Sequence, residues 1–137
     1  MKELKRVRVR DVMKHDFDVV DGLATVADAL RHMKHLDTKA MVVRKRDEDD
    51  EYGIVEVEDI ATEVLARNRS PERVNIYEIM QKPLVGVDPA MDIRYCARMF
   101  ERYRLNRAAV IEDRQVIGIV SYADIVIKGM KTMLDVS

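Results

Sequence analysis

The sequence is short of the residues that build disulfide frameworks and membrane spans. Its 137 residues include one Cys, no Trp, three Pro and five Gly, and aromatic residues make up only 5% of it. The single Cys excludes a disulfide within the chain and is typical of a reducing compartment. No apolar run approaches the roughly 20 residues that span a bilayer, and the first residues are charged. We therefore expect a cytoplasmic protein that makes no membrane contact.

An excess of charge of either sign is also missing. Lys and Arg number 24 against 25 Asp and Glu, and the net charge is −1. A balanced charge gives no general reason to expect nucleic acid as a partner. The hydrophobic content of 47% supports a buried core, and the length suits one compact domain or two very small halves.

The motifs that carry catalysis or hold metals are absent as well. There is no phosphate loop, dinucleotide fingerprint or zinc spacing, and Ser121 has no His in a nucleophile pattern. His32 and His35 can share a helix face but lack further ligands, and the acidic run 47–51 lacks the Gly and the spacing of a calcium loop. Cys96 lies on an apolar stripe and is interpreted as a small buried hydrophobe. We expect neither an enzyme nor a metal site.

What the sequence does contain is an internal repeat. Residues 118–125, Gly-Ile-Val-Ser-Tyr-Ala-Asp-Ile, are nearly copied at residues 53–60, 65 positions earlier. Both copies of the repeat contain the Asp, but the first copy has Glu56 at the position where the second has Ser121. In both copies a short apolar run precedes a helical pattern, which is typical of a strand that leads into a helix.

The repeat extends over most of the chain. Residues 9–13 correspond to residues 76–80 at an offset of 67, and residues 39–43 correspond to residues 107–111 at an offset of 68. The apolar patterns change from a two-residue to a 3.6-residue period in the same order in each copy. Each copy therefore predicts a strand, a helix, two strands and a final helix.

The predicted fold is α/β, with two pseudosymmetric units, residues 1–69 and 70–137, packed sheet to sheet. Thr25 is expected to cap the first helix, and Asp92 takes its place in the second copy. The apolar stripes of these two helices should face the cores. They consist of Val26, Ala29, Leu30 and Met33 in the first copy and of Ile93, Cys96, Ala97 and Phe100 in the second.

The two copies share a set of marks in the same order. They are Asp11–Met13, the helix through Met33, Ala40–Val43 and Gly53–Asp59 in the first copy, and Glu78–Met80, Arg107–Ile111 and Gly118–Asp124 in the second. This pattern resembles the CBS domain, a family named after cystathionine β-synthase. Met41 and Ala109 stand where the family often has Pro, a departure that touches only a strand edge.

The resemblance implies a tandem pair, or Bateman module, that regulates a partner protein. Such pairs bind adenosine-containing ligands in clefts between their two copies and often form homodimers. We expect AMP, ADP or ATP as the first ligands, with S-adenosylmethionine and NAD as further options, and no required cofactor. The alternative is a ligand-free dimerisation or scaffold module whose clefts are vestigial.

The resemblance also implies a ligand site built on the second copy. There Asp124 would hold the ribose, and Ser121 and Arg107 would lie near the phosphates, which suits a helix N-terminus and a guanidinium fork. Plainer interpretations stay open, because Ser121 and Asp124 also form a capping box and Arg107 also suits a solvated strand end. The base would be held by residues of the other copy. The complete predicted set is Asp124, Ser121, Arg107, Tyr122, Phe17, Val19 and Thr38.

A second site on Asp59, with Glu56 and Lys39, is expected to be closed to phosphate. Glu56 places a carboxylate where the second copy has a hydroxyl. Two unit charges about 5 Å apart repel by roughly 3 kcal/mol at an effective dielectric constant near 20. Lys39, matched to Arg107, would offset part of this repulsion by pairing with Glu56.

The final helix predicts a homodimer. Met130, Met133 and Leu134 extend its apolar stripe past the end of the repeat. An exposed apolar stripe of this kind marks an interface.

Overall fold

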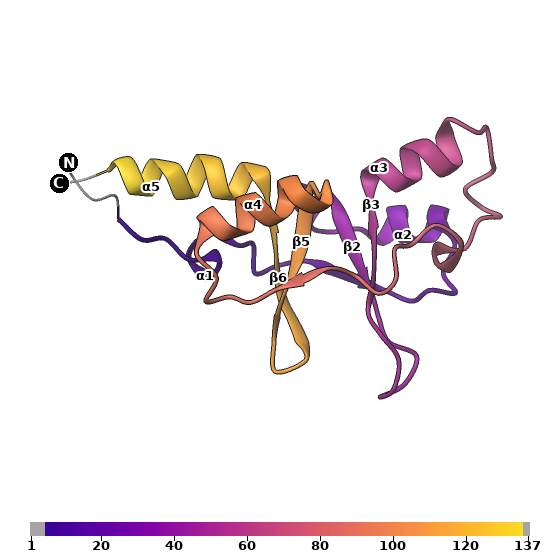
Figure 1. The fold of residues 1–137 in the computed structure, drawn as a ribbon. Helices are drawn as coiled ribbons and strands as arrows, with labels where there is room; N and C mark the ends of the chain where they lie inside the picture. The colour runs from indigo at the N-terminus through magenta and orange to yellow at the C-terminus, as the bar shows by residue number, and fades with distance from the viewer. Residues whose placement is uncertain (1–4, 136–137) are drawn as a thin grey trace. The chain divides into compact units, whose positions relative to one another are not determined.

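The computed structural model of the chain describes residues 5–135, which divide into two compact units (Figure 1). The N-terminal unit is made of residues 16–84. The C-terminal unit is made of residues 5–15 and 85–135. Both units combine a small sheet with helices, so the predicted α/β class is confirmed. Within the described residues no helix is both long enough and apolar enough to cross a bilayer.

The N-terminal unit has one three-stranded sheet in the order β1-β2-β3. Strands β1 and β2 are parallel and are joined through helix α2, while β2 and β3 are antiparallel and form a hairpin. Its elements are β1 (Asp18–Val20), α2 (Val26–His32), η1 (Leu36–Thr38), β2 (Ala40–Val43), β3 (Gly53–Glu56), α3 (Val57–Ile60), η2 (Ala61–Leu65) and η3 (Ile76–Glu78).

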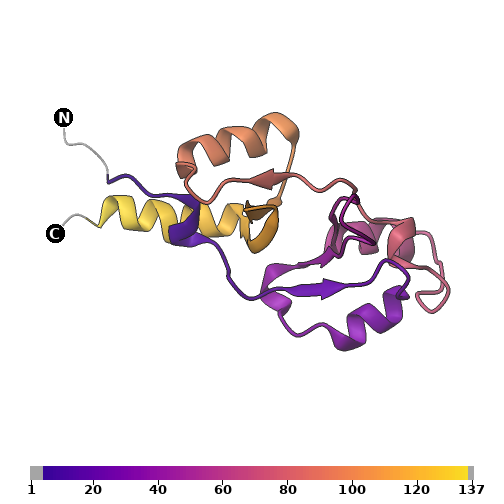
Figure 2. The same ribbon diagram turned by 90° about the horizontal axis from the view of Figure 1, so that it is seen from below.

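The C-terminal unit repeats this topology in the order β4-β5-β6. Its elements are α1 (Val9–Val12), β4 (Gly86–Val87), α4 (Ile93–Tyr103), β5 (Arg107–Glu112), β6 (Gln115–Ser121), η4 (Asp124–Met130) and α5 (Lys131–Leu134). Figure 1 shows η4 and α5 as one continuous helical rod. In Figure 2, α4 and α2 each lie alongside the first strand of their own sheet. The predicted order of strand, helix, two strands and helix is confirmed in both units.

The compact units do not follow the predicted division at residues 69 and 70. Val7, Val9 and Val12 are at most 2% exposed and belong to the core of the C-terminal unit. Val74 and Ile76, their counterparts in the second copy, belong to the core of the N-terminal unit. Each copy therefore lends its leading segment to the core of the unit that holds the other copy's sheet.

The predicted helix caps are present. The Thr25 hydroxyl accepts a hydrogen bond from the Asp28 backbone N–H at 3.1 Å. The Asp92 carboxylate accepts one from the Arg94 backbone N–H at 2.8 Å. Such bonds satisfy N–H groups that have no partner inside the helix.

The apolar stripes are narrower than predicted. Val26, Ala29, Ile93, Cys96 and Phe100 are buried, but Leu30 is 44% exposed. On the final helix Met133 is buried in the core of its own unit. Met130 and Leu134 are exposed at 49% and 69%. Only part of the stripe that predicted a homodimer is therefore available to a second chain.

Candidate ligand-binding site

The site in the C-terminal unit is built where β6 ends and the final helix begins. The Ser121 backbone N–H and hydroxyl both donate to Asp124 Oδ2, at 2.9 and 3.0 Å. The Asp124 backbone N–H lies 3.3 Å from Ser121 Oγ. The predicted capping box is therefore present. Its carboxylate is only 2% exposed, so its charge is held inside the unit.

Lys14 supplies the opposite charge, and nothing in the sequence pointed to it. Its Nζ lies 2.5 Å from Asp124 Oδ1, 110 positions away in the chain. Two backbone hydrogen bonds to Ile119, at 2.8 and 3.0 Å, fix Lys14 beside β6. Lys128, one helical turn beyond Asp124, adds a second ammonium at 3.4 Å. The (i, i+4) spacing of Lys128 could have been recognised in the sequence, whereas the partnership with Lys14 depends on the exchanged segment.

Arg107 lies on the same part of the sheet as Ser121. The two residues are directly opposite in the antiparallel β5–β6 ladder. Side chains at such positions point to the same face with Cβ atoms about 4.5–5.5 Å apart. Arg107 is only 9% exposed, so it is not the solvated strand-end charge of the plainer interpretation. The structure thus brings Arg107 together with Ser121 and Asp124.

Tyr122 follows Ser121 and is partly committed to the core. Its ring meets Phe100 edge to face, with ring centres 5.1 Å apart. Tyr122 remains 39% exposed, and its backbone N–H donates to the Asn106 carbonyl at 3.3 Å. The aromatic contact fixes the start of the helix against α4.

The N-terminal unit holds the same arrangement with different charges. The Glu56 backbone N–H donates to Asp59 Oδ2 at 2.8 Å. The Gln81 side-chain amide donates to Glu56 Oε2 at 3.0 Å and to the Asp59 carboxylate at 3.3 Å. Gln81 is held by two backbone hydrogen bonds to Ile54, as Lys14 is held to Ile119. A neutral amide therefore stands where the other unit has an ammonium.

The strand register corrects the position assigned to Lys39. Ala40 lies opposite Glu56, as Arg107 lies opposite Ser121. Lys39 therefore corresponds to Asn106, and the strand offset is 67 rather than 68. The offset of 68 expected from the sequence was one residue too large, because it aligned Lys39 with Arg107, which are both basic. Lys39 is exposed and has a left-handed backbone, φ 57°, at the end of η1.

The family model of the CBS domain matches residues 9–66 and 76–130. The chain belongs to the CBS domain family. Both matched segments are complete copies of the repeat, so this is a tandem CBS pair.

Three known proteins show how far this likeness extends. A hexameric CBS-CP12 protein from bloom-forming cyanobacteria shares 38% identity and a TM-score of 0.85, over 90% of this chain and 71% of that one. An uncharacterized protein of Methanocaldococcus jannaschii is 25% identical, over 79% of this chain and 59% of its own length. The CBS domain pair of protein MJ0100, solved with 5′-methylthioadenosine and S-adenosyl-L-methionine, has a TM-score of 0.73 and 22% identity, over 89% of this chain and 98% of that one. This chain thus spans about three fifths of the Methanocaldococcus relative.

The remaining predicted residues of this CBS pair lie in the N-terminal unit. Val19 is 45% exposed on β1, and Phe17 is half-buried just before that strand. Thr38 is 2% exposed, and its hydroxyl lies 2.8 Å from the His35 carbonyl and 3.0 Å from the Ala40 carbonyl. These two contacts hold the Thr38 hydroxyl at the C-terminal end of η1. The roles of these three residues toward a base stay predictions.

Within residues 5–135 no three His, Cys, Asp or Glu side chains gather closely enough to hold a metal ion.

Proposed function

We propose that this CBS pair is a regulatory module that binds a phosphate-bearing adenosine ligand, AMP, ADP or ATP before S-adenosylmethionine or NAD. The observation that carries the proposal is a pair of ammonium groups on one buried carboxylate, beside a buried Arg. Lys14 and Lys128 contact Asp124, and Arg107 lies opposite Ser121. The two ammonium groups exceed the single negative charge of the carboxylate, which favours an anionic ligand. The guanidinium fork of Arg107 and the N–H groups at the start of the helix suit a phosphate.

The ligand has to exchange contacts with the protein, because the acceptor sites of Asp124 are already used. An ionised carboxylate offers about four lone-pair sites. Oδ2 accepts two hydrogen bonds from Ser121, and Oδ1 faces Lys14 and Lys128. A ribose diol reaches Asp124 only when one of these groups moves away. A phosphate on the same ligand gives a displaced ammonium a new partner, which adenosine alone does not.

This exchange also provides a route to regulation. The exchanged leading segment ends at His15, where the chain passes into the N-terminal unit. Lys14 is the residue just before His15. A ligand that takes Asp124 from Lys14 acts on this connecting segment. Binding would then favour one arrangement of the chain over another, which is a population shift that a partner protein can detect.

The test is a thermal-shift and calorimetry panel of adenosine, AMP, ADP, ATP, S-adenosylmethionine and NAD. A ligand that binds only the folded chain raises its stability by about 2.7 kcal/mol at a hundredfold excess over Kd. We expect AMP to bind at least about tenfold more tightly than adenosine, as charge-assisted hydrogen bonds are worth about 1.5–3 kcal/mol. Asp124→Ala should weaken AMP binding by about ten- to a hundredfold. A panel without any shift, or equal binding of adenosine and AMP, contradicts the proposal.

The second candidate function is a ligand-free dimerisation module. It is favoured by the fully used acceptor sites of Asp124 and by the exposed apolar side chains of the final helix. These are Val126, Ile127, Met130 and Leu134, which are 49–69% exposed. An exposed apolar patch marks a protein interface, and we propose that it forms a homodimer in either case. Light scattering at micromolar concentration tests this, with Ile127→Lys expected to give monomers.

A further inference from the structure

A cavity of about 570 Å³ lies within the N-terminal unit, at the base of the β2–β3 hairpin. It borders Gly53, the first residue of β3, whereas Glu56 and the Asp59 site lie at the other end of that strand. The cavity is called here the hairpin cavity. Its volume lies within the roughly 300–1,000 Å³ typical of small-molecule sites. It is separate from every residue assigned above to adenosine binding.

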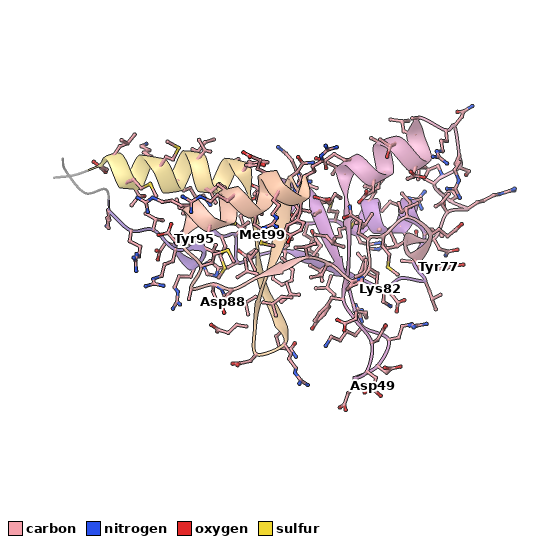
Figure 3. The ribbon with its side chains drawn as sticks, viewed as in Figure 1. Asp49, Tyr77, Lys82, Asp88, Tyr95 and Met99 are labelled. Carbon is pink, nitrogen blue, oxygen red and sulfur yellow. The ribbon has the colours of Figure 1, made fainter. Side chains whose placement is uncertain are left out.

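One side of the hairpin cavity is apolar. Val43 is 2% exposed, and Met80 packs against the same core, so both form an inner wall. Leu23 and Tyr77 line the cavity but are 76% and 52% exposed, which places large apolar surfaces at its mouth. Figure 3 shows Tyr77 and Lys82 on this unit. A ligand with an apolar body would cover these side chains.

The other side is basic and partly held in place. Asp50 binds Lys82, with Nζ at 2.7 Å from Oδ1, and Arg46, with Nε at 3.1 Å from Oδ2. The hydrogen bond from Lys82, followed by those from the backbone and side chain of Arg46, holds the pKa of Asp50 well below its usual range. Both cations are therefore oriented at the cavity by one carboxylate.

Two further cations leave the cavity with an excess of positive charge. Arg44 and Lys45 also line it, and Asp21 is the acidic residue among the lining side chains. Four cations face Asp21 and Asp50, an excess of two positive charges. The other acidic residues of the hairpin do not line the cavity, and Figure 3 places Asp49 at the distant hairpin tip.

The other unit shows that this basic rim is not required by the fold. By the strand register, Arg44 and Lys45 correspond to Ile111 and Glu112. Ile111 packs against Gly86, so the equivalent position serves packing there. The packing contact that Ile111 makes therefore does not account for the basic pair of the N-terminal unit.

We propose that the hairpin cavity binds a small phosphate ester with an apolar or aromatic body. A phosphate monoester carries about −1.5 to −2 charges at neutral pH, which matches the excess of two. Arg44 and Arg46 supply forks that can bind phosphate through two parallel hydrogen bonds. The apolar body lies on Val43, Leu23 and Tyr77.

The probe for this proposal is phenyl phosphate, titrated into the full chain with amide NMR and calorimetry. Inorganic phosphate and phenol test the two halves of the probe. We expect phenyl phosphate to shift the amides of Gly22, Gly53 and Tyr77 and to bind at least about tenfold more tightly than either half. Amide shifts confined to Ser121 and its neighbours, or equal binding of phenyl phosphate and inorganic phosphate, would overturn the proposal.

A matched pair of charge reversals separates a built site from general attraction. Lys45→Glu should weaken phenyl phosphate binding by about tenfold or more, since it replaces a positive charge that lines the cavity by a negative one. Lys34→Glu changes the charge of the same unit equally at an exposed position outside the cavity and should leave binding within about twofold. An equal loss in both variants would show that only net charge attracts the probe. Asp124 lies outside this cavity, so Asp124→Ala separates the two proposals. AMP binding unchanged by Asp124→Ala, with phenyl phosphate binding weakened by Lys45→Glu, would reject the proposed function alone.

Discussion

Replacing Lys14 by Met tests the ion pair on which the candidate site depends. The substitution keeps an unbranched apolar side chain and removes the ammonium that lies 2.5 Å from Asp124 Oδ1. Removing one partner of a buried pair costs about 3–5 kcal/mol when the other charge is left uncompensated. Here Lys128 at 3.4 Å and two hydrogen bonds from Ser121 remain, so we expect a loss of about 2–3 kcal/mol.

Urea unfolding and thermal unfolding measure this loss directly. For a chain of this length about 1 kcal/mol corresponds to roughly 4 °C in the midpoint, so Lys14→Met should lower it by about 8–12 °C. Lys128→Met is the matched control. Its side chain is 51% exposed and its contact with Asp124 is longer, so it should cost under about 1 kcal/mol.

The double-mutant cycle with Asp124→Asn isolates the pair from other effects of each change. The coupling between Lys14 and Asp124 should be about 1–3 kcal/mol, the range of residues in contact. The reasoning fails if Lys14→Met is no more destabilising than Lys128→Met. It also fails if Lys14→Met costs the same in the Asp124→Asn background as in the natural chain.

Three further predictions follow from particular side chains. Glu56→Ser should raise the stoichiometry of AMP from one to two per chain in calorimetry, because it removes a repulsion of roughly 3 kcal/mol; unchanged stoichiometry and affinity would show that the first cleft is closed by shape. Gly118→Ala should cost about 1–3 kcal/mol in urea, because its Cβ would lie 2.6 Å from a backbone carbonyl oxygen. Gly22→Ala, whose Cβ would have ordinary contacts from 3.5 Å, should stay within about 0.5 kcal/mol, and equal costs would refute this account. Burial raises the pKa of the Cys96 thiol from 9.0 to about 11, so a thiol reagent at pH 8 should label the native chain far more slowly than the unfolded one. The stability due to this buried thiol is complete below about pH 9 and is lost as the pH rises toward 11, and rapid native labelling would contradict the burial.

The elements could be predicted from the sequence because local rules act within each of them. The Gly-to-Asp repeat located the strand and helix around Ser121, and Thr25 and Asp92 begin their helices as predicted. The exchange of the leading segments could not be predicted this way. The apolar residues at Val7 and Val74 show only that these segments are buried, and not which sheet buries them.

The candidate site was predictable only where its residues are close in the sequence. The capping box of Ser121 and Asp124 spans one helical turn and follows from spacing alone. Lys14 joins the site through tertiary structure, and no periodicity reports such a contact. The one-residue error at Lys39 arose because strand alignment by residue type ignores the ladder, where a shift of one position moves a side chain to the other face.

The corrected alignment shows that the two copies differ in charge at four positions around the shared Asp. Lys14, Ser121, Arg107 and Lys128 of the C-terminal site correspond to Gln81, Glu56, Ala40 and Glu63 of the N-terminal one. Each of the four replacements makes the N-terminal site more negative, while the central Asp is the same. Lys39, which corresponds to Asn106, differs in the opposite sense. Because the backbone contacts around the four positions are equivalent, the difference acts on what each site can hold. This difference supports the proposal that the chain binds one phosphate-bearing ligand, at its C-terminal site.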